Sequence, residues 1–293
     1  MEKKRYIVGL GEALWDVLPE GKKLGGAPAN FAYHAGQFGL DTIAISALGE
    51  DDLAEETIEA LKEHNLNYLM PRVPYPTGTV QVTLAEGGIP TYEIKEGVAW
   101  DNIPYTDEMA EIAKNARAVC FGSLAQRSEV SRQTILKFLD TMDDDTERIY
   151  DINLRQHFYS LEVIEESLRR ATILKLNEEE IEIVSALFHL EGNAESRCRQ
   201  LIAKFPTLQI VILTCGAVGS NVFTETENSY VDTPKVKVAD TVGAGDSFTA
   251  TFVAQYLKGK SIQEAHRLAV KASAFVCTQE GATPVFPKEI LEA

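Results

Sequence analysis

Short apolar runs rich in β-branched residues alternate along the chain with stretches of helical periodicity. The runs predict strands at Tyr6–Leu10, Ile43–Leu48, Ala118–Phe121, Ile149–Ile152, Ile173–Leu176 and Ile210–Thr214. The periodic stretches predict helices at Ala29–Phe38, Leu53–His64, Val130–Met142, Leu161–Arg169, Glu178–Leu187 and Ser196–Phe205. Strands that alternate with helices of this length favour crossover connections and a mainly parallel sheet covered on both faces.

The segment Thr77–Trp100 departs from this pattern. Its apolar residues occupy every second position on either side of Gly87-Gly88, namely Val80, Val82, Leu84, Tyr92 and Ile94. This alternation predicts an antiparallel hairpin with one wet face. Such a hairpin is either a lid that closes over an active site or an edge hairpin without a moving role, and the pattern leaves both open.

Composition narrows the class of protein. The 293 residues are 45% hydrophobic and 25% charged, as in ordinary globular proteins, and they suffice for one large α/β domain. The formal net charge of −16 argues against nucleic acid and anionic membrane surfaces as partners. The first apolar run breaks at Gly11-Glu12 and favours a strand over a signal peptide, so we expect a cytoplasmic protein.

The four cysteines are Cys120, Cys198, Cys215 and Cys277, and they form no C-x-x-C pair. Because metal clusters and disulfide frameworks need closer or patterned spacing, we expect four reduced thiols.

The stretch Asp240–Phe248, DTVGAGDSF, carries the candidate chemistry. Behind it an apolar stripe with helical spacing ends at Gly259, which predicts a helix with a glycine cap. Gly243, Ala244 and Gly245 would then occupy the N-terminus of this helix, where free amides and the dipole favour an anion.

Known nucleotide loops do not explain this stretch. GAGDSF lacks the third glycine of G-x-G-x-x-G and lies late in the chain, and Gly259-Lys260-Ser261 lacks the leading glycine of a P-loop. Asp246 has two interpretations on its residues alone. It is either the N-cap of the helix or the base that accepts a hydroxyl proton during phosphoryl transfer.

DTVGAGDSF resembles the second signature of the PfkB, or ribokinase-like, carbohydrate kinases. Gly25–Asn30, GGAPAN, resembles the G-G-x-x-x-N substrate motif of that family, and Asn177–Glu180, NEEE, resembles its N-x-x-E element. The resemblance implies a three-layer α/β/α sandwich with a mainly parallel central sheet. It also implies a single catalytic domain over residues 1–293, with a small β-sheet lid formed mainly by about 12–24 and 72–101.

The resemblance assigns roles on the sugar side of the site. Asp246 would be the general base, and the amides of Gly243, Ala244 and Gly245 would form an anion hole. The sugar would be bound by Asp16, Gly25, Gly26, Asn30 and Arg155, the last in the D-x-N-x-R stretch. The local pattern alone allows other roles for these residues. The glycine segment would also suit the entry from a loop into a helix, and Asp16 could lie in a surface turn. Arg155 could be a cation that faces water.

Further residues are implied around ATP and metal ions. Asn177, Thr214, Gly216, Gly219, Gly243, Gly245 and the stretch 272–281 would border ATP. Glu180 would act on Mg²⁺ through water, although Asn177 and Glu180 also have the spacing of a capping box. A monovalent cation, K⁺, would lie near Asp240, Val242 and Gly281.

The N-terminal region GEALWDVLPEGKKLGGAPANFAYH is most similar to that of fructokinases, which implies D-fructose as the substrate. The D-x-N-x-R stretch also occurs in 2-keto-3-deoxygluconate kinases, and other PfkB sugar or nucleoside kinases stay open. A non-catalytic sugar-binding protein would be expected to lose Asp246 or the glycines. The family's lid often pairs with that of a second subunit, so we expect a homodimer through the lid.

Overall fold

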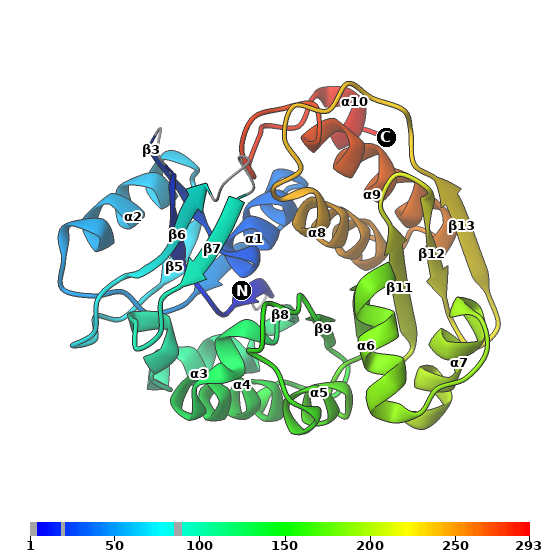
Figure 1. Ribbon diagram of the computed structural model, residues 1–293, viewed down its shortest axis with the longest axis horizontal. Coiled ribbons are helices and arrows are strands. Elements are labelled where there is room, and N and C mark those ends of the chain that lie inside the picture. Colours follow the sequence, from blue (N-terminus) through cyan, green and yellow to red (C-terminus); the bar gives the residue numbers. More distant parts are fainter. Residues whose placement is uncertain (1–4, 19–20, 85–89) are drawn as a thin grey trace.

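The computed structural model describes residues 5–18, 21–84 and 90–293. Within these residues nine strands form the central sheet, in the order β13-β12-β11-β10-β9-β8-β1-β4-β5 (Figure 1). All neighbouring pairs from β11 to β5 are parallel, whereas β12 and β13 are antiparallel at one edge. The strands of this sheet are β1 Tyr6–Leu10, β4 Thr42–Ile45, β5 Asn67–Leu69, β8 Ala116–Phe121, β9 Glu147–Asp151, β10 Ile173–Asn177, β11 Ile210–Cys215, β12 Gly219–Phe223 and β13 Asn228–Asp232.

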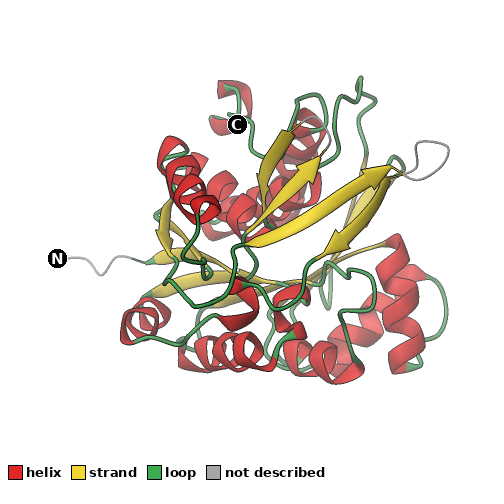
Figure 2. Cartoon of the chain, turned by 60° about the vertical axis from the view of Figure 1, so that its left-hand side comes forward, coloured by secondary structure: helices red, strands yellow, loops and turns green. Residues whose placement is uncertain are grey.

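Helices cover both faces of this sheet, which gives the predicted three layers (Figure 2). On one side lie α1 Ala27–Gln37, α2 Asp52–Glu63, α8 Ala244–Leu257, α9 Ile262–Val276 and the short α10 Lys288–Leu291. On the other side lie α3 Asp107–Lys114, α4 Glu129–Thr141, α5 Leu161–Leu168, α6 Glu178–Phe188 and α7 Ala194–Lys204, with the 3₁₀ turns η1 Ala99–Asn102 and η2 Leu124–Arg127. The mainly parallel sheet therefore lies between two helical layers.

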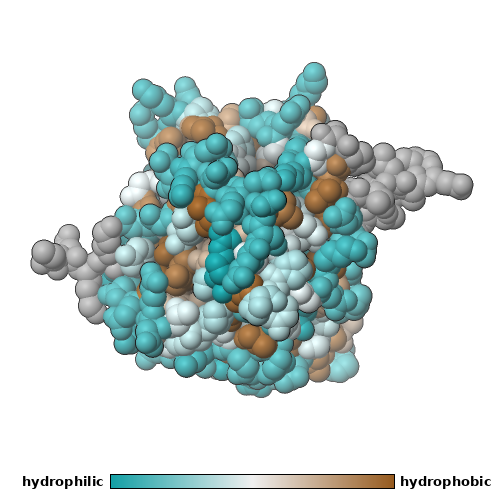
Figure 3. Space-filling model, turned by 90° about the vertical axis from the view of Figure 1, so that its left-hand side faces the viewer, coloured by the Kyte–Doolittle hydropathy of each residue, from teal (hydrophilic) through white to brown (hydrophobic). Residues whose placement is uncertain are grey.

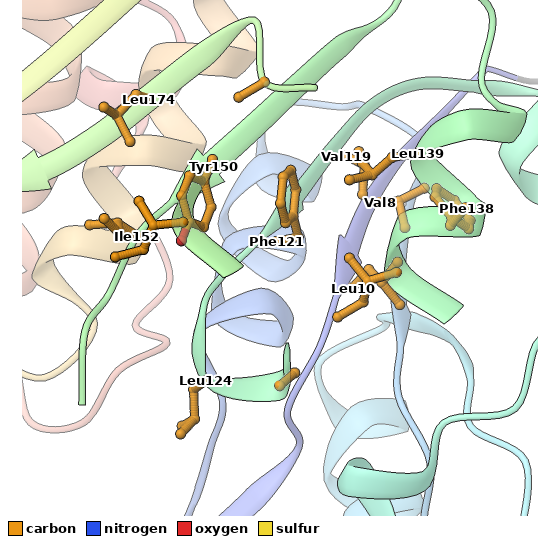
Figure 4. Packing of buried hydrophobic residues seen from close by; sticks show 14 of the residues in the cluster. Val8, Leu10, Val119, Phe121, Leu124, Phe138, Leu139, Tyr150, Ile152 and Leu174 are labelled. Atoms are coloured by element: carbon orange, nitrogen blue, oxygen red, sulfur yellow. The ribbon is translucent and has the colours of Figure 1, made fainter. Parts of the chain in front are cut away.

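The strands are buried on both faces, so their successive side chains enter different cores. Val8 and Val119 pack into the cluster beneath α3–α7, whereas Ile7 and Ala118 pack beneath α1, α8 and α9. Figure 4 shows the first cluster, in which the Phe121 and Tyr150 rings stack with centroids 5.2 Å apart. This double burial explains the near-continuous apolar runs.

A separate small sheet stands beside the central one, and its described strands have the order β3-β2-β6-β7. They are β2 Leu14–Leu18, β3 Gly21–Gly25, β6 Gly78–Leu84 and β7 Pro90–Ile94. The pairing of β6 with β7 is antiparallel, as predicted for the hairpin, and the predicted Gly87-Gly88 turn lies outside the described residues. Figure 3 views the molecule from the side that carries α2 and this sheet, where hydrophobic residues are scattered among hydrophilic ones.

Arg127 fixes the base of the small sheet to the body. Its guanidinium lies 4.0 Å from the Trp100 ring centre and 4.6 Å from that of Phe158. It also forms a buried ion pair with Asp101, Nε to Oδ1 at 2.8 Å, and donates to the carbonyl of Lys95 just beyond β7. A side chain on Gly78 would meet Trp100, with its Cβ 2.3 Å from Nε1, so β6 begins directly against this cluster.

Every predicted strand and helix is present, with bounds shifted by at most three residues. The sequence patterns missed β5, β12 and β13 of the central sheet. β5 and β13 are edge strands that are only partly buried, so neither has a long apolar run. β12 is mostly buried but begins with Gly219, Ser220 and Asn221, which break its apolar pattern.

The cysteines agree with the expectation from their spacing. Cys120, Cys198, Cys215 and Cys277 are all free thiols. Among residues 5–18, 21–84 and 90–293, no helix has both the length and the apolar character that a membrane span requires.

Candidate active site

The N-terminus of α8 lies over the carboxyl ends of the central parallel strands. The helix begins at Ala244, directly after Gly243, whose φ of +76° is a left-handed conformation that favours glycine. A Cβ on Gly243 would lie 2.5 Å from the carbonyl oxygen of Ala282. Gly259 follows the other end of α8 with φ of +86°, so the predicted helix and its glycine cap are confirmed.

No side chain in the described part of the chain caps this N-terminus. The Ala244 amide donates to the carbonyl of Thr241 over a long 3.3 Å, and the structure gives the Gly245 and Asp246 amides no partner among the described residues. Since the first amides of a helix have no partner within the helix, those at α8 can donate to an anion.

Asp246 occupies the third position of α8 and is not its cap, so the N-cap interpretation is wrong. Its Oδ2 instead accepts a hydrogen bond from Asn30 Nδ2 at 2.8 Å, across 216 residues of sequence. Burial, and then the charge of Asp151, raises the pKa of Asp246 to about 6. This carboxylate can accept a proton near neutral pH, as a general base requires.

Two buried residues beneath α8 were missed by the sequence analysis. Lys175 in β10 and Asp151 in β9 are partners in register, and Lys175 Nζ lies 3.1 Å from Asp151 Oδ1. The other oxygen of Asp151 accepts from Thr249 Oγ1 of α8 at 3.1 Å. Burial opposes the charge of Lys175, but the carboxylates of Asp151 and Glu180 outweigh it, so its pKa is raised. The sequence feature that could have identified this pair is a lysine within the otherwise mostly apolar strand ILKLN.

Glu12 is a third buried ionisable residue that no motif identified. It is 4% exposed, and its Oε2 has no hydrogen-bond partner among the described residues. Burial raises the pKa of Glu12 to about 7, and the charge of Asp246 adds to this rise. Glu12, Asp151 and Asp246 line one small cavity, so three carboxyl groups lie close together beside α8.

The glycines of the GGAPAN segment allow close backbone approaches. Gly26 has φ of +123°, and a Cβ there would lie 2.4 Å from the carbonyl oxygen of Glu12. A Cβ on Gly25 would lie 2.8 Å from Asp16 Oδ2. As predicted, α1 begins with a proline in its first turn, and it carries Asn30 toward Asp246.

Asp16 and Arg155 lie on the same side of the site. Asp16 is directly opposite Lys23 in the β2–β3 pair, and burial raises the pKa of Asp16 while the charges of Arg155 and Lys23 lower it. The Arg155 side chain is exposed, in the loop after β9, and its charge also acts on Glu12 and Asp246. A second cavity, of about 400 Å³, includes Asn30 and Lys23 in its wall.

A cavity of about 720 Å³ lies on the other side of the α8 N-terminus. Of the residues predicted to border ATP, its wall includes Asn177, Thr214, Gly216, Gly219 and Gly245, and it reaches Ser273, Ala274 and Cys277 of the stretch 272–281. Apolar side chains form much of the remaining wall, namely Val236, Val238, Phe248 and Val270. An apolar cavity that ends at helix amides has the form needed for a base joined to phosphates.

Asn177 and Glu180 form the predicted capping box at the start of α6. Asn177 Oδ1 accepts from the amides of Glu179 and Glu180 at 2.9 Å each, and Glu180 Oε2 accepts from the Asn177 amide at 2.8 Å. The second oxygen, Oε1, accepts from the Leu154 amide at 2.9 Å. Each carboxylate oxygen retains acceptor capacity, so Glu180 can still accept from a water bound to Mg²⁺.

The residues predicted around a monovalent cation also lie together. Asp240 Oδ1 accepts from the Val242 amide at 3.1 Å, and Oδ2 accepts from the Gly281 amide at 3.2 Å. Lys23 Nζ is 3.8 Å from Asp240 Oδ2. Among the described residues no group of three or more His, Cys, Asp or Glu side chains could hold a metal ion, so a cation here would depend on carbonyl oxygens.

Comparison with known proteins agrees with this geometry. Residues 19–289 match the pfkB family carbohydrate kinase family. An ATP-dependent 6-phosphofructokinase of Thermoanaerobacterium thermosaccharolyticum is 28% identical over 98% of this chain and 92% of its own length. A fructokinase of Rhizobium leguminosarum bv. trifolii is 27% identical over 85% of this chain and 78% of its own.

A Pyrococcus horikoshii sugar kinase, described as uncharacterized, is 30% identical over 87% of this chain and 84% of its own length. Its crystal structure in complex with ATP has a TM-score of 0.80 to this chain, with coverage of 95% and 93%. The family match spans nearly the whole sequence and includes the GGAPAN, NEEE and DTVGAGDSF stretches. The chain therefore belongs to the pfkB family of carbohydrate kinases, and its fold is ribokinase-like.

Proposed function

We propose that this kinase transfers the γ-phosphate of ATP to D-fructose and releases fructose 6-phosphate and ADP. The observation that carries the proposal is the contact of Asp246 with Asn30 at the uncapped N-terminus of α8, beside the 720 Å³ cavity. A base, an amide that can orient a hydroxyl, and free helix amides meet there, as phosphoryl transfer to an alcohol requires.

The two sides of α8 would hold the two substrates. The ATP base would lie against the apolar wall formed by residues such as Val236 and Val238, with its phosphates directed to the α8 amides. The sugar would lie beside Asn30, with Asp16, Gly25, Gly26 and Arg155 around its other hydroxyls. This arrangement would place the acceptor hydroxyl between Asp246 and the phosphoryl group.

In the reaction, Asp246 would accept the proton of the attacking hydroxyl. The sugar oxygen forms a bond to the γ-phosphorus as the bond from that phosphorus to the β-phosphate oxygen breaks. The Gly243–Gly245 amides would stabilise charge on the transferring group, a kind of contact whose loss costs about 2.7–4 kcal/mol per donor in other enzymes. Mg²⁺ would neutralise the phosphates, with Glu180 holding one of its waters.

An acidic or phosphorylated sugar is the second candidate for the acceptor. Arg72 and Lys95 do not favour it, because Arg72 binds the Gly49 carbonyl and Glu55, and Lys95 binds Glu93. Lys23 and Arg155, however, both act on Asp16 and bring positive charge to the sugar side. That charge suits the carboxylate of 2-keto-3-deoxygluconate or the phosphate of fructose 6-phosphate.

A substrate panel tests these alternatives. ADP release should be measured with ATP, Mg²⁺ and each of fructose, fructose 6-phosphate, ribose, 2-keto-3-deoxygluconate and nucleosides, with and without K⁺. We expect the highest kcat/KM for fructose, and a higher value for an acidic sugar would instead establish the second candidate. Sugar-dependent thermal stabilisation without ADP release from any compound would show a binding protein and overturn the kinase proposal.

We also propose that the small sheet acts as a lid and pairs with that of a second subunit in a homodimer. Val80 and Ile94, at the base of the hairpin, pack into the core of their own chain, so this base would lie outside the interface. Light scattering at micromolar concentration tests the assembly, and a monomer would contradict it.

A further inference from the structure

Lys175 is the one positive charge that reaches the nucleotide cavity from within the core among the residues described. It is 8% exposed, and it lines the 720 Å³ cavity together with Ala244 and Gly245. Its Nζ has a single hydrogen bond in the described structure, to Asp151 Oδ1 at 3.1 Å. Because an ammonium group has three donors, two of them are left for another ligand.

The ammonium lies against the N-terminus of α8. A Cβ on Gly245 would be 3.1 Å from Lys175 Nζ, so the absence of a side chain at this position leaves the space beside the ammonium free. The start of a helix carries partial positive charge, so the ammonium and the α8 amides together favour an anion placed between them. Asp151 and Glu180 also stabilise the charge of Lys175. The second oxygen of Asp151 is taken by Thr249.

We propose that Lys175 binds the terminal phosphate of the nucleotide and, with the α8 amides, completes the anion hole. This inference rests on the proposed function for its catalytic part, whereas its binding part requires only that the cavity accepts a nucleotide. As the β–γ bond breaks and the phosphoryl group moves to the acceptor oxygen, Lys175 stays protonated and its charge stabilises the transferring oxygens. The acceptor proton passes to Asp246, so Lys175 neither gives nor takes a proton.

Lys175 could alternatively serve only as the structural counterion of Asp151. Removing one member of a buried pair leaves an uncompensated charge, whereas replacing both often preserves the fold. The test is therefore the double variant Lys175→Met with Asp151→Asn, which removes both charges. Lys175→Gln alone is a second variant, because its amide can still donate to Asp151. Lys235→Met is the matched control, since Lys235 lines the same cavity but is exposed.

Calorimetric titration of AMP-PNP, ADP and adenosine, each with Mg²⁺, separates the two roles. Loss of a charged hydrogen bond should weaken AMP-PNP binding about 10- to 100-fold in both Lys175 variants. We expect a smaller loss for ADP, and no loss for adenosine, which has no phosphate. Lys235→Met should weaken all three ligands alike and only slightly. Unchanged AMP-PNP affinity in the Lys175 variants, or an equal loss for all three ligands, would overturn the inference.

Turnover provides the catalytic readout. For the best sugar of the panel, kcat should fall about 10²- to 10³-fold in the Lys175 variants, as when one anion-hole donor is removed, with the sugar KM unchanged. A raised sugar KM at normal kcat would contradict the catalytic role. If the wild-type chain binds AMP-PNP through Lys175 but releases no ADP with any sugar, the proposed function fails while the binding site stands.

Discussion

The helices α6 and α8 both begin at the edge of the sheet that faces the 720 Å³ cavity, yet their N-termini differ. At α6, Asn177 accepts from two amides and Glu180 returns a bond to the Asn177 amide. At α8, Gly243 offers no side chain, and the structure gives the amides of Gly245 and Asp246 no partner among the described residues. The amides at the start of α6 are paired by nearby side chains, whereas those at the start of α8 have free donors among the described residues.

The proposed function depends on this difference between two otherwise similar helix starts. Glycine at an N-cap costs roughly a few tenths of a kcal/mol relative to a capping side chain, so α8 gives up a little stability at Gly243. In return, the amides remain accessible and the backbone approaches Ala282 more closely than any side chain would permit. The predictions below test whether α8 alone carries the chemistry and α6 mainly the stability.

Replacing Asp246 by Asn should have the largest effect on activity. The amide keeps an oxygen that can accept from Asn30 but cannot take a proton, so kcat should fall by about 10²- to 10⁴-fold. Turnover measured as ADP release, together with a thermal melt to confirm an intact fold, is the check. Near-normal turnover in a folded Asp246→Asn variant would show that Asp246 is not the base of the reaction.

Replacing Gly245 by Ala should disturb the anion hole without unfolding the protein. The added Cβ would lie 3.1 Å from Lys175 Nζ and shift the ammonium slightly, so kcat should fall by about tenfold, less than the roughly 10²-fold that a full 1 Å misplacement can cost. Gly259→Ala provides the control at the other end of α8, where a Cβ meets nothing within 4 Å. Its positive φ should reduce stability while kcat stays unchanged, so equal activity losses in both variants would contradict a local effect.

Acid should inactivate the enzyme through Asp246. Its pKa is raised to about 6, and the proton acceptor must be ionised, so activity should rise with pH through about 6 and then level off. At pH 5 we expect roughly a tenfold lower kcat/KM than on the plateau. Asp151→Asn removes the carboxylate whose charge, after burial, raises this pKa, and should move the rise to lower pH. An unchanged profile in this variant would show that Asp151 does not influence Asp246.

Replacing Asn177 by Ala should have the smallest effect among these changes. Loss of the α6 cap should lower the free energy of unfolding by about 1 kcal/mol. Chemical denaturation measures that difference, and ADP release in the same variant should fall far less than in Asp246→Asn. A loss of activity as large as that of Asp246→Asn would mean that α6 also takes part in the chemistry.

Much of the fold follows from local pattern. The strands buried on both faces appear as apolar runs, and the glycines on both sides of α8 mark its two ends, because these signals act within a few residues. The start of α8 at the glycines and the place of Asp246 beside it were therefore predictable. The residues alone left open whether Asp246 caps the helix, and the structure shows that it does not. The role of Asp246 as a base is what the resemblance implies.

Other parts of the site depend on contacts that local pattern does not contain. Asn30 and Asp246 are 216 residues apart, and their hydrogen bond exists only because α1 packs against α8. Lys175 meets Asp151 because β9 and β10 are neighbours with these residues in register. The burial of Glu12 likewise depends on the segment that precedes α1. Such groups become visible only when the sheet order is known.

The Arg127 cluster bears on how the small sheet could move. The guanidinium is enclosed by Trp100 and Phe158, is paired with Asp101, and reaches the end of β7, while β6 starts against the same Trp100 ring. The Arg127 cluster therefore fixes both strands of the hairpin at the end nearest the central sheet. If the small sheet closes over the sugar, the strand ends beside Arg127 would move least. Closure would then be a bending of the sheet about this cluster, and the sheet would not slide as a whole.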